Sequence, residues 1–219
     1  MSSPRVTELA RELQSAGIGI PETVPPNLAR IAVAIYRALA TGSPLAPTQL
    51  ESLTSASGVP ADLVRVAAAR WLELDEAGSL TGFGGLTLRP TQHRLILDGK
   101  DFYLWCALDG FLVAHVLGQP VRIETLCPAT GTPIEVAVSR EGVEHLAPSD
   151  AVMSVMVPES NAACSVSETR RGFCDFVSFY RSEQVAFESM KRPGTTVVTM
   201  DQGFALARLL MLPLINASS

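Results

Sequence analysis

The stretch Ser79–Leu88, which reads Ser-Leu-Thr-Gly-Phe-Gly-Gly-Leu-Thr-Leu, decides the fold of the first part of the chain. Two short extended segments, 79–82 and 86–88, flank Phe-Gly-Gly at 83–85. Consecutive glycines suit the tight turn of a β-hairpin, because glycine adopts positive φ angles without strain. The stretch therefore predicts a hairpin, and the residues before it determine which unit the hairpin completes.

Three stretches with helical periodicity precede the hairpin. Apolar residues recur at helical spacing over 28–39, and a second, shorter helix is expected over about 47–55. A third helix is expected to begin near Pro60, to run to Leu74 with Trp71 on its apolar face, and to end before Gly78. Three helices followed by a hairpin indicate a winged-helix-like unit.

A winged helix can bind DNA through its third helix, but the charges of this one are unfavourable. Residues 48–74 hold two arginines against three carboxylates: Arg65 and Arg70 against Glu51, Asp62 and Glu73. The formal net charge of the whole chain is -5, whereas a phosphate-binding surface needs a row of cations. The unit is therefore expected to be a scaffold, and nucleic acid is not an expected partner.

The remainder of the chain has the pattern of short strands and turns. Strands are expected over 94–97, 101–108, 121–126, 133–138, 152–157 and 174–180, a short buried helix over 111–117, and an apolar C-terminal helix over 202–212. This pattern predicts an α+β protein with a mainly antiparallel sheet. The expected domains are a loosely attached N-terminal lead-in (1–26), the winged-helix-like domain (27–89) and an α+β catalytic domain (90–219).

Composition limits the class of protein. The chain has 219 residues, of which 47% are hydrophobic and 18% charged, enough apolar surface for a sizeable core. Its apolar runs are shorter than the roughly 18 to 20 residues of a membrane span. Charged residues stand where a secretory signal needs an apolar segment. We expect a cytoplasmic protein with no membrane partner.

Four cysteines carry the first hint of chemistry. They are Cys106, Cys127, Cys164 and Cys174, and the three histidines are His93, His115 and His145. In a cytoplasmic protein disulfides are rare, so each cysteine is first interpreted as a thiol. No Cys-x-x-Cys pair exists, and the histidines have no ligand spacing to the cysteines. A closed tetrahedral zinc site is therefore not expected.

Cys106 and Asp109 lie three positions apart in Trp-Cys-Ala-Leu-Asp at 105–109. On a turn or at a helix start this spacing places both side chains on one face, where a carboxylate can exchange a proton with a thiol. Spacing alone favours a simpler interpretation, a buried structural cysteine beside a helix-capping aspartate.

Longer motifs favour chemistry. They are Trp-Cys-Ala-Leu-Asp at 105–109 with Tyr103 before it, Cys-x-Ala-Thr-Gly-x-Pro at 127–133, Gly-Phe-Cys at 172–174 followed by Phe176, Val177 and Phe179, and Gly-x-Leu-Thr-Leu-Arg at 84–89. In order and spacing the chain resembles the bacterial organomercurial lyases (alkylmercury lyases) from about Leu28 to Leu210.

The resemblance implies cleavage of carbon–mercury bonds by protonation of the carbon, which releases a hydrocarbon and leaves Hg(II). Mercury is soft and prefers few thiolate ligands, so facing cysteines suit it. The residues that match the family's essential pair are Cys106 and Cys174, and Asp109 matches its proton-handling carboxylate. One thiolate would attack mercury, while Asp109 would take the proton of the second thiol and deliver it to the carbon.

The resemblance also assigns supporting residues. The apolar side chains expected to form the pocket for the organic group are Phe102, Trp105, Phe111 and Phe173, with ordinary core packing as the alternative. Cys127 matches a structural thiol, whereas Cys164 and the histidines match nothing essential. Some relatives carry a cysteine directly after the pocket cysteine, where this chain has Asp175, so mercury capture at that adjacent position should be absent.

No organic cofactor is expected, because mercury enters as substrate and leaves as product with the help of external thiols. The implied acceptor of Hg(II) is mercuric reductase, and the expected state is a monomer or a weak dimer. Two other functions stay open. A mercury-responsive winged-helix regulator would bind DNA, and a non-catalytic thiol sink for metal would keep both cysteines without needing Asp109.

Overall fold

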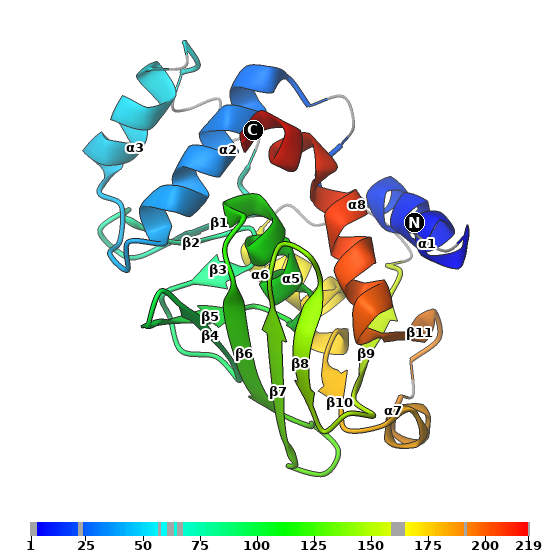
Figure 1. Cartoon of the computed structure of the whole chain (residues 1–219). Helices are drawn as coiled ribbons and strands as arrows, with labels where there is room; N and C mark the ends of the chain where they lie inside the picture. The colour runs from blue at the N-terminus through cyan, green and yellow to red at the C-terminus, as the bar shows by residue number, and fades with distance from the viewer. Residues whose placement is uncertain are drawn as a thin grey trace.

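A computed structural model describes residues 4–21, 24–56, 58–60, 64, 68–158, 165–190 and 192–218 (Figure 1). The helices are α1 (Pro4–Ser15), α2 (Pro26–Leu39), α3 (Pro47–Ser55), α5 (Ala107–Leu117), α6 (Val166–Gly172), α7 (Glu183–Ser189) and α8 (Met200–Ser218), with a 3-10 turn η1 (Cys174–Phe176). The strands are β1 (Leu72–Leu74), β2 (Leu80–Phe83), β3 (Leu86–Thr87), β4 (His93–Leu97), β5 (Lys100–Leu104), β6 (Val121–Leu126), β7 (Pro133–Val138), β8 (Val143–Ala147), β9 (Val152–Met156), β10 (Phe179–Tyr180) and β11 (Thr195–Thr199).

Two antiparallel sheets organise the described residues. The larger sheet has the strand order β1-β2-β3-β5-β4-β6-β7-β8, and the smaller has the order β10-β9-β11. Each strand pairing in both sheets is antiparallel. The predicted α+β class with a mainly antiparallel sheet is confirmed.

Helix α5 is the centre of the core. All its residues from Ala107 to Ala114 are buried, and it packs between the large sheet and α8 (Figure 1). Gly110 makes this close packing possible, because a Cβ there would collide with the Ile123 side chain of β6. The burial explains why this segment is apolar on every side and shows no amphipathic pattern.

The predicted hairpin is confirmed. Strands β2 and β3 pair through Phe83 and Leu86, and the turn consists of Gly84 and Gly85, whose φ angles are 52° and 100°. Helices α2 and α3 are also confirmed within two residues of their predicted bounds. The hairpin does not end in solvent, because β3 pairs with β5 and so joins the large sheet.

The third predicted helix is wrong at its C-terminal end. Leu72–Leu74 is strand β1, which pairs with β2, so tertiary hydrogen bonding overrides the helical periodicity of this segment. Residues 61–63 and 65–67, where the rest of that helix was expected, lie outside the described residues. The winged-helix character of the N-terminal unit stays a prediction.

The strand predicted over 174–180 is also corrected. The segment begins with the 3-10 turn η1 and becomes a strand only at Phe179–Tyr180. The N–H of Val177 donates to the carbonyl of Cys174, which closes the turn and leaves Cys174 buried at its start. The apolar residues of 174–180 are therefore spread over a turn and a short strand, and they do not form one continuous strand.

The N-terminal segment is attached more closely than its composition predicts. Helix α1 packs along α8, with Leu9 and Leu13 buried (Figure 1). The N–H of Ile20 donates to the carbonyl of Leu210 over 2.9 Å. The division into domains 1–26, 27–89 and 90–219 stays a prediction.

Across the described residues, no helix combines the length and the apolar character that crossing a membrane requires.

The buried side chain of His93 predicts acid sensitivity. Its Nδ1 has no hydrogen-bond partner among the described residues, and burial lowers its pKa from 6.5 to about 4. Between about pH 6.5 and about pH 4, the His93 side chain is protonated in the unfolded chain but not in the folded chain, so the free energy of unfolding falls as the pH falls. Between about pH 7 and about pH 5, we expect the wild type to lose about 2 kcal/mol more of its free energy of unfolding than His93→Gln. Urea unfolding at both pH values measures the difference. His145→Gln, on the exposed face of β8, is the control, and equal losses in all three proteins would contradict the prediction.

Candidate active site

Cys106 and Asp109 meet at the start of the buried helix α5. Cys106 is the N-cap residue, with extended backbone angles, and Asp109 occupies the first turn. The backbone N–H of Cys106 donates to Oδ2 of Asp109 over 2.7 Å. A carboxylate at this place satisfies a free N–H group and interacts favourably with the positive end of the helix dipole. The local sequence therefore folds Asp109 back over Cys106.

Cys174 reaches the same place from η1. The N–H of Ala107 donates to the carbonyl of Val177 over 3.1 Å, which ties the end of this turn to the beginning of α5. The Sγ atoms of Cys106 and Cys174 and a carboxylate oxygen of Asp109 all lie within 4.8 Å of one another, and all three residues are buried. The fold thus unites residues that the sequence separates by 68 positions.

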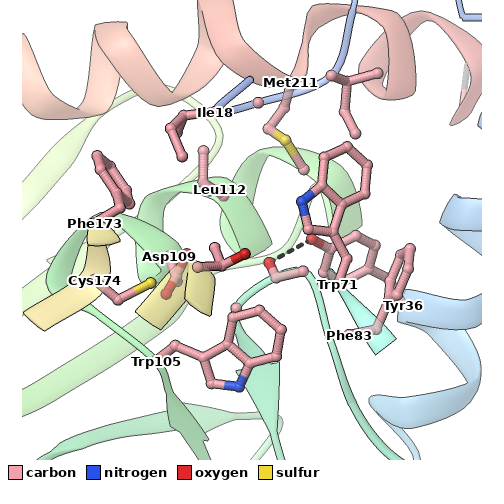
Figure 2. Close-up of a pocket in the computed structure, with 15 residues that line it drawn as sticks. Ile18, Tyr36, Trp71, Phe83, Trp105, Asp109, Leu112, Phe173, Cys174 and Met211 are labelled. Atoms are coloured by element: carbon pink, nitrogen blue, oxygen red, sulfur yellow. Dashed lines mark hydrogen bonds between the residues drawn. The ribbon is translucent and has the colours of Figure 1, made fainter. Parts of the chain in front are cut away.

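A mostly apolar pocket opens beside this cluster (Figure 2). It has a volume of about 60 Å³, and its lining residues include Ile18, Tyr36, Trp71, Phe83, Trp105, Asp109, Leu112, Phe173, Cys174 and Met211. Cys174 and Phe173 lie at one side of Asp109, and Trp71 and Phe83 lie at the other (Figure 2).

Two of the four aromatic residues predicted to line a pocket do so. They are Trp105 and Phe173. Phe102 and Phe111 are fully buried and are not lining residues of this pocket. Phe111 instead packs against Phe179 and Phe204, with ring centroids 5.8 and 6.0 Å away. For these two residues the structure shows core packing, which was the stated alternative.

Burial raises the pKa of all three groups of the cluster. Loss of solvent raises the pKa of Asp109 to about 7, against hydrogen bonds from Cys106 that lower it. Burial likewise raises the pKa of the Cys106 thiol, and its hydrogen bond to Cys174 and the charge of Asp109 raise it further. The Asp109 carboxyl group therefore changes its protonation state near neutral pH, while the surroundings favour the neutral form of each thiol.

Cys174 is in a different electrostatic position. A hydrogen bond with Cys106 lowers the pKa of Cys174, but burial and the charge of Asp109 outweigh it, so that the pKa is raised overall. The positive charge of Arg170 on α6 opposes this rise. Of the two thiols, Cys174 is the one whose thiolate the charge of Arg170 favours.

The hairpin turn forms one wall of the site. The Tyr36 hydroxyl donates to the Gly84 carbonyl over 2.7 Å (Figure 2). The N–H of Trp105 donates to the Gly85 carbonyl over 2.9 Å. A Cβ at Gly85 would collide with the Asp109 carboxyl group. Glycine is therefore required at 85 both for its φ angle and for space.

Several residues of this wall were missed from the sequence. Tyr36 belongs to α2 and was expected only as part of a helix, while Trp71 and Phe83 were assigned to secondary structure without a role in the site. The double glycine at 84–85 was the available signal, because so tight a turn also permits close approach of another group.

The remaining predicted residues lie elsewhere. Cys127 is buried in the turn after β6, where its N–H donates to the Thr132 carbonyl over 2.8 Å, and it is not part of the three-residue cluster. Cys164 lies outside the described residues. Among the histidines, His93 is buried, His115 stacks on Phe204, and His145 is exposed. Asp175, next to Cys174, is exposed.

Comparisons with known proteins agree on one family. The family model described as alkylmercury lyase matches residues 86–211. The alkylmercury lyase of Bacillus cereus is 34% identical over 164 residues, covering 74% of this chain and 72% of the relative. That of Pseudomonas putida is 32% identical over 195 residues and covers 89% of each chain.

A solved structure has the same fold. The crystal structure titled as the mercury-bound form of MerB2 superposes with a TM-score of 0.73, and the match covers 95% of this chain and 99% of that one. The sequence identity is 20%, so this likeness concerns the fold alone.

The contact between Gly85 and Asp109 predicts a pair of contrasting variants. Gly85→Ala and Gly99→Ala both place a Cβ at a positive φ angle, at 100° and 73°. Gly99→Ala should lower the free energy of unfolding by about 1 kcal/mol, and Gly85→Ala should lower it further because its Cβ also meets Asp109. Only Gly85→Ala should displace Asp109, since a Cβ at Gly99 meets nothing within 4 Å. Removal of this negative charge should lower the pKa of Cys106, measured by ultraviolet titration of the thiolate. An unchanged titration in Gly85→Ala would show that the turn does not position Asp109.

Proposed function

Because the chain belongs to the alkylmercury lyase family, we propose that it cleaves carbon–mercury bonds at the cluster of Cys106, Asp109 and Cys174. The observation that carries this site is the meeting of two buried thiols and a buried carboxylate within 4.8 Å. Thiolates are the ligands that soft metals select, and two of them fit the low coordination number of mercury. The carboxylate adds a proton carrier within reach of both.

We infer the order of steps from the charged groups beside each thiol. The charge of Arg170 favours the thiolate of Cys174, while Cys106 is the thiol whose backbone N–H binds Asp109, so Cys174 is the first nucleophile. It displaces the external thiolate from mercury and forms the first sulfur–mercury bond, while its proton leaves on that thiol. The thiol of Cys106 then loses its proton to Asp109 and forms the second sulfur–mercury bond. Asp109 is already in place, because its carboxylate accepts a hydrogen bond from the backbone N–H of Cys106.

The same proton completes the reaction. With two sulfur ligands, the mercury–carbon bond is electron-rich at carbon, and Asp109 delivers its proton there as the bond breaks. In balance, R–Hg–SR′ and two cysteine thiols give R–H, R′SH and Hg(II) held by two cysteine thiolates. Asp109 is ionised again at the end, so it is both the base and the acid of the cycle.

The product and its partners complete the proposal. External thiols would remove Hg(II) from Cys106 and Cys174 and pass it to mercuric reductase in the cytoplasm. No organic cofactor takes part in this scheme, since each bond change uses sulfur, a carboxylate or the substrate. A monomer or weak dimer suffices, because the three residues of the cluster come from one chain.

The two alternative functions fit less well. Neither a regulator nor a metal sink needs a buried carboxylate whose pKa lies close to 7. Burying such a group lowers the stability of the folded protein. The family comparisons also name enzymes. The lyase function explains both observations.

Turnover variants test the cluster. With phenylmercury and excess thiol, the wild type should release benzene, while Cys106→Ser and Cys174→Ser should lose about a thousandfold or more of the rate. Asp109→Asn should lose about a hundredfold or more yet still bind Hg(II), because both thiols remain. Cys164→Ser, which has no counterpart in the family motifs, is the control. Normal turnover by Asp109→Asn would refute the proton transfer, and absence of benzene from the wild type would refute the function.

The pH dependence tests which state of Asp109 begins the cycle. Since Asp109 must accept a proton, kcat/KM should fall as the pH drops below about 7, where its carboxyl group is protonated in the free enzyme. Arg170→Gln should move this limb to higher pH, because Arg170 lowers the pKa of Asp109. Arg171→Gln, the exposed neighbour on α6, should leave the limb in place. A limb that Arg170→Gln does not move would assign it to another group.

A further inference from the structure

A second cavity adjoins the active-site pocket. It has a volume of about 190 Å³ and lies against one face of α2. Its lining residues are apolar except for Arg70: Ile20, Pro21, Val24, Leu28, Ile31, Ala32, Ile35, Val64, Ala68, Trp71, Phe83 and Leu214. We call it the α2 chamber. Leu28, Ile31, Ala32 and Ile35 recur at helical spacing, so the chamber is built on the apolar stripe of the helix.

The α2 chamber and the active-site pocket share a wall. Ile20, Trp71 and Phe83 line both cavities. Phe83 is held by an edge-to-face contact with Tyr36, with ring centroids 5.1 Å apart, and the Arg70 guanidinium lies 5.1 Å from the centroid of Trp71. The two cavities are therefore neighbours, separated by these three residues.

The arrangement along the pocket has a direction. In Figure 2 Cys174 lies on one side of Asp109, and Trp71 and Phe83 lie on the other. Mercury held by the Cys174 thiolate alone, as in the first step of the proposed cycle, would carry its organic group on the side away from that sulfur, because two-coordinate mercury is linear. The carbon bonded to mercury would then face Asp109, and the rest of the organic group would point toward Trp71, Phe83 and the α2 chamber.

Size decides which groups need the chamber. The active-site pocket offers about 60 Å³, whereas a cavity of about 150 Å³ is known to hold benzene. A methyl group fits the pocket alone, but an aromatic ring does not. The adjoining 190 Å³ are lined by the apolar side chains that such a ring requires. An apolar cavity left empty also costs stability, since its lining atoms lack partners.

We propose that the α2 chamber is the subsite for bulky organic groups, aryl or longer alkyl, of the mercury compounds that this enzyme cleaves. The inference rests on the proposed function and extends it. Leu28, Ile31, Ala32 and Ile35 of α2 thereby determine which substrates are accepted, although none of them touches the thiol–carboxylate cluster. Methylmercury makes no use of the chamber.

Filling the chamber is the direct test. Ala32→Leu adds bulk at its floor, and Ala34→Leu makes the same change on the half-buried side of α2, away from both cavities. We expect Ala32→Leu to lower kcat/KM for phenylmercury by about tenfold or more, while the value for methylmercury stays within about twofold. Ala34→Leu should change neither. Equal losses on both compounds, or no loss on phenylmercury, would overturn the subsite.

A variant that enlarges the α2 chamber keeps the proposal testable if Ala32→Leu does not fold. Leu28→Ala should raise kcat/KM for naphthylmercury relative to phenylmercury by about threefold or more, since it widens the chamber. An unchanged ratio would also overturn the subsite. The wild type separates the two levels of the proposal. Release of hydrocarbon from both phenylmercury and methylmercury with unaltered ratios in the variants refutes the subsite alone, whereas no release from either refutes the lyase function itself.

Discussion

One hydrogen bond, from the Cys106 N–H to the Asp109 carboxylate, sets the conditions for the rest of the site. It fixes a carboxylate at the beginning of the buried helix α5. There the negative charge is stabilised by an N–H group and by the helix dipole instead of by water. The neighbouring chain must then make room. Gly85 approaches so closely that a methyl group there would meet Asp109, and Tyr36 holds the preceding carbonyl in place.

Burial of three ionisable groups together gives the cluster its chemical selectivity. The two thiols have raised pKa values and are neutral near pH 7, so the site offers hard cations such as magnesium only one carboxylate, whereas such cations prefer several oxygen ligands. A metal that bonds covalently to sulfur can still displace the protons. In the proposed cycle, the proton that one thiol gives up stays close to the carbon atom that receives it.

Local signals in the sequence predicted local structure well. The helical spacing over 28–39, the double glycine at 84–85 and the alternation over 121–126 and 133–138 each reflect interactions within a few residues, and all are confirmed. The Cys106–Asp109 pair is local in the same sense. The placement of Cys174, the strand at Leu72–Leu74 and the contribution of Tyr36 depend on contacts between distant segments, which periodicity does not encode. Only the family resemblance supplied Cys174, and neither approach supplied the wall of Trp71 and Phe83.

The pocket walls come from almost the whole length of the chain, from Ile18 before α2 to Met211 in the last helix. During synthesis Cys106 leaves the ribosome 94 residues before Met200, the first residue of α8, whose Met211 lines the pocket. The pocket is therefore complete only after α8 has docked on the rest of the chain. A chain interrupted before Met211 keeps Cys106, Asp109 and Cys174 but lacks part of the enclosure around them.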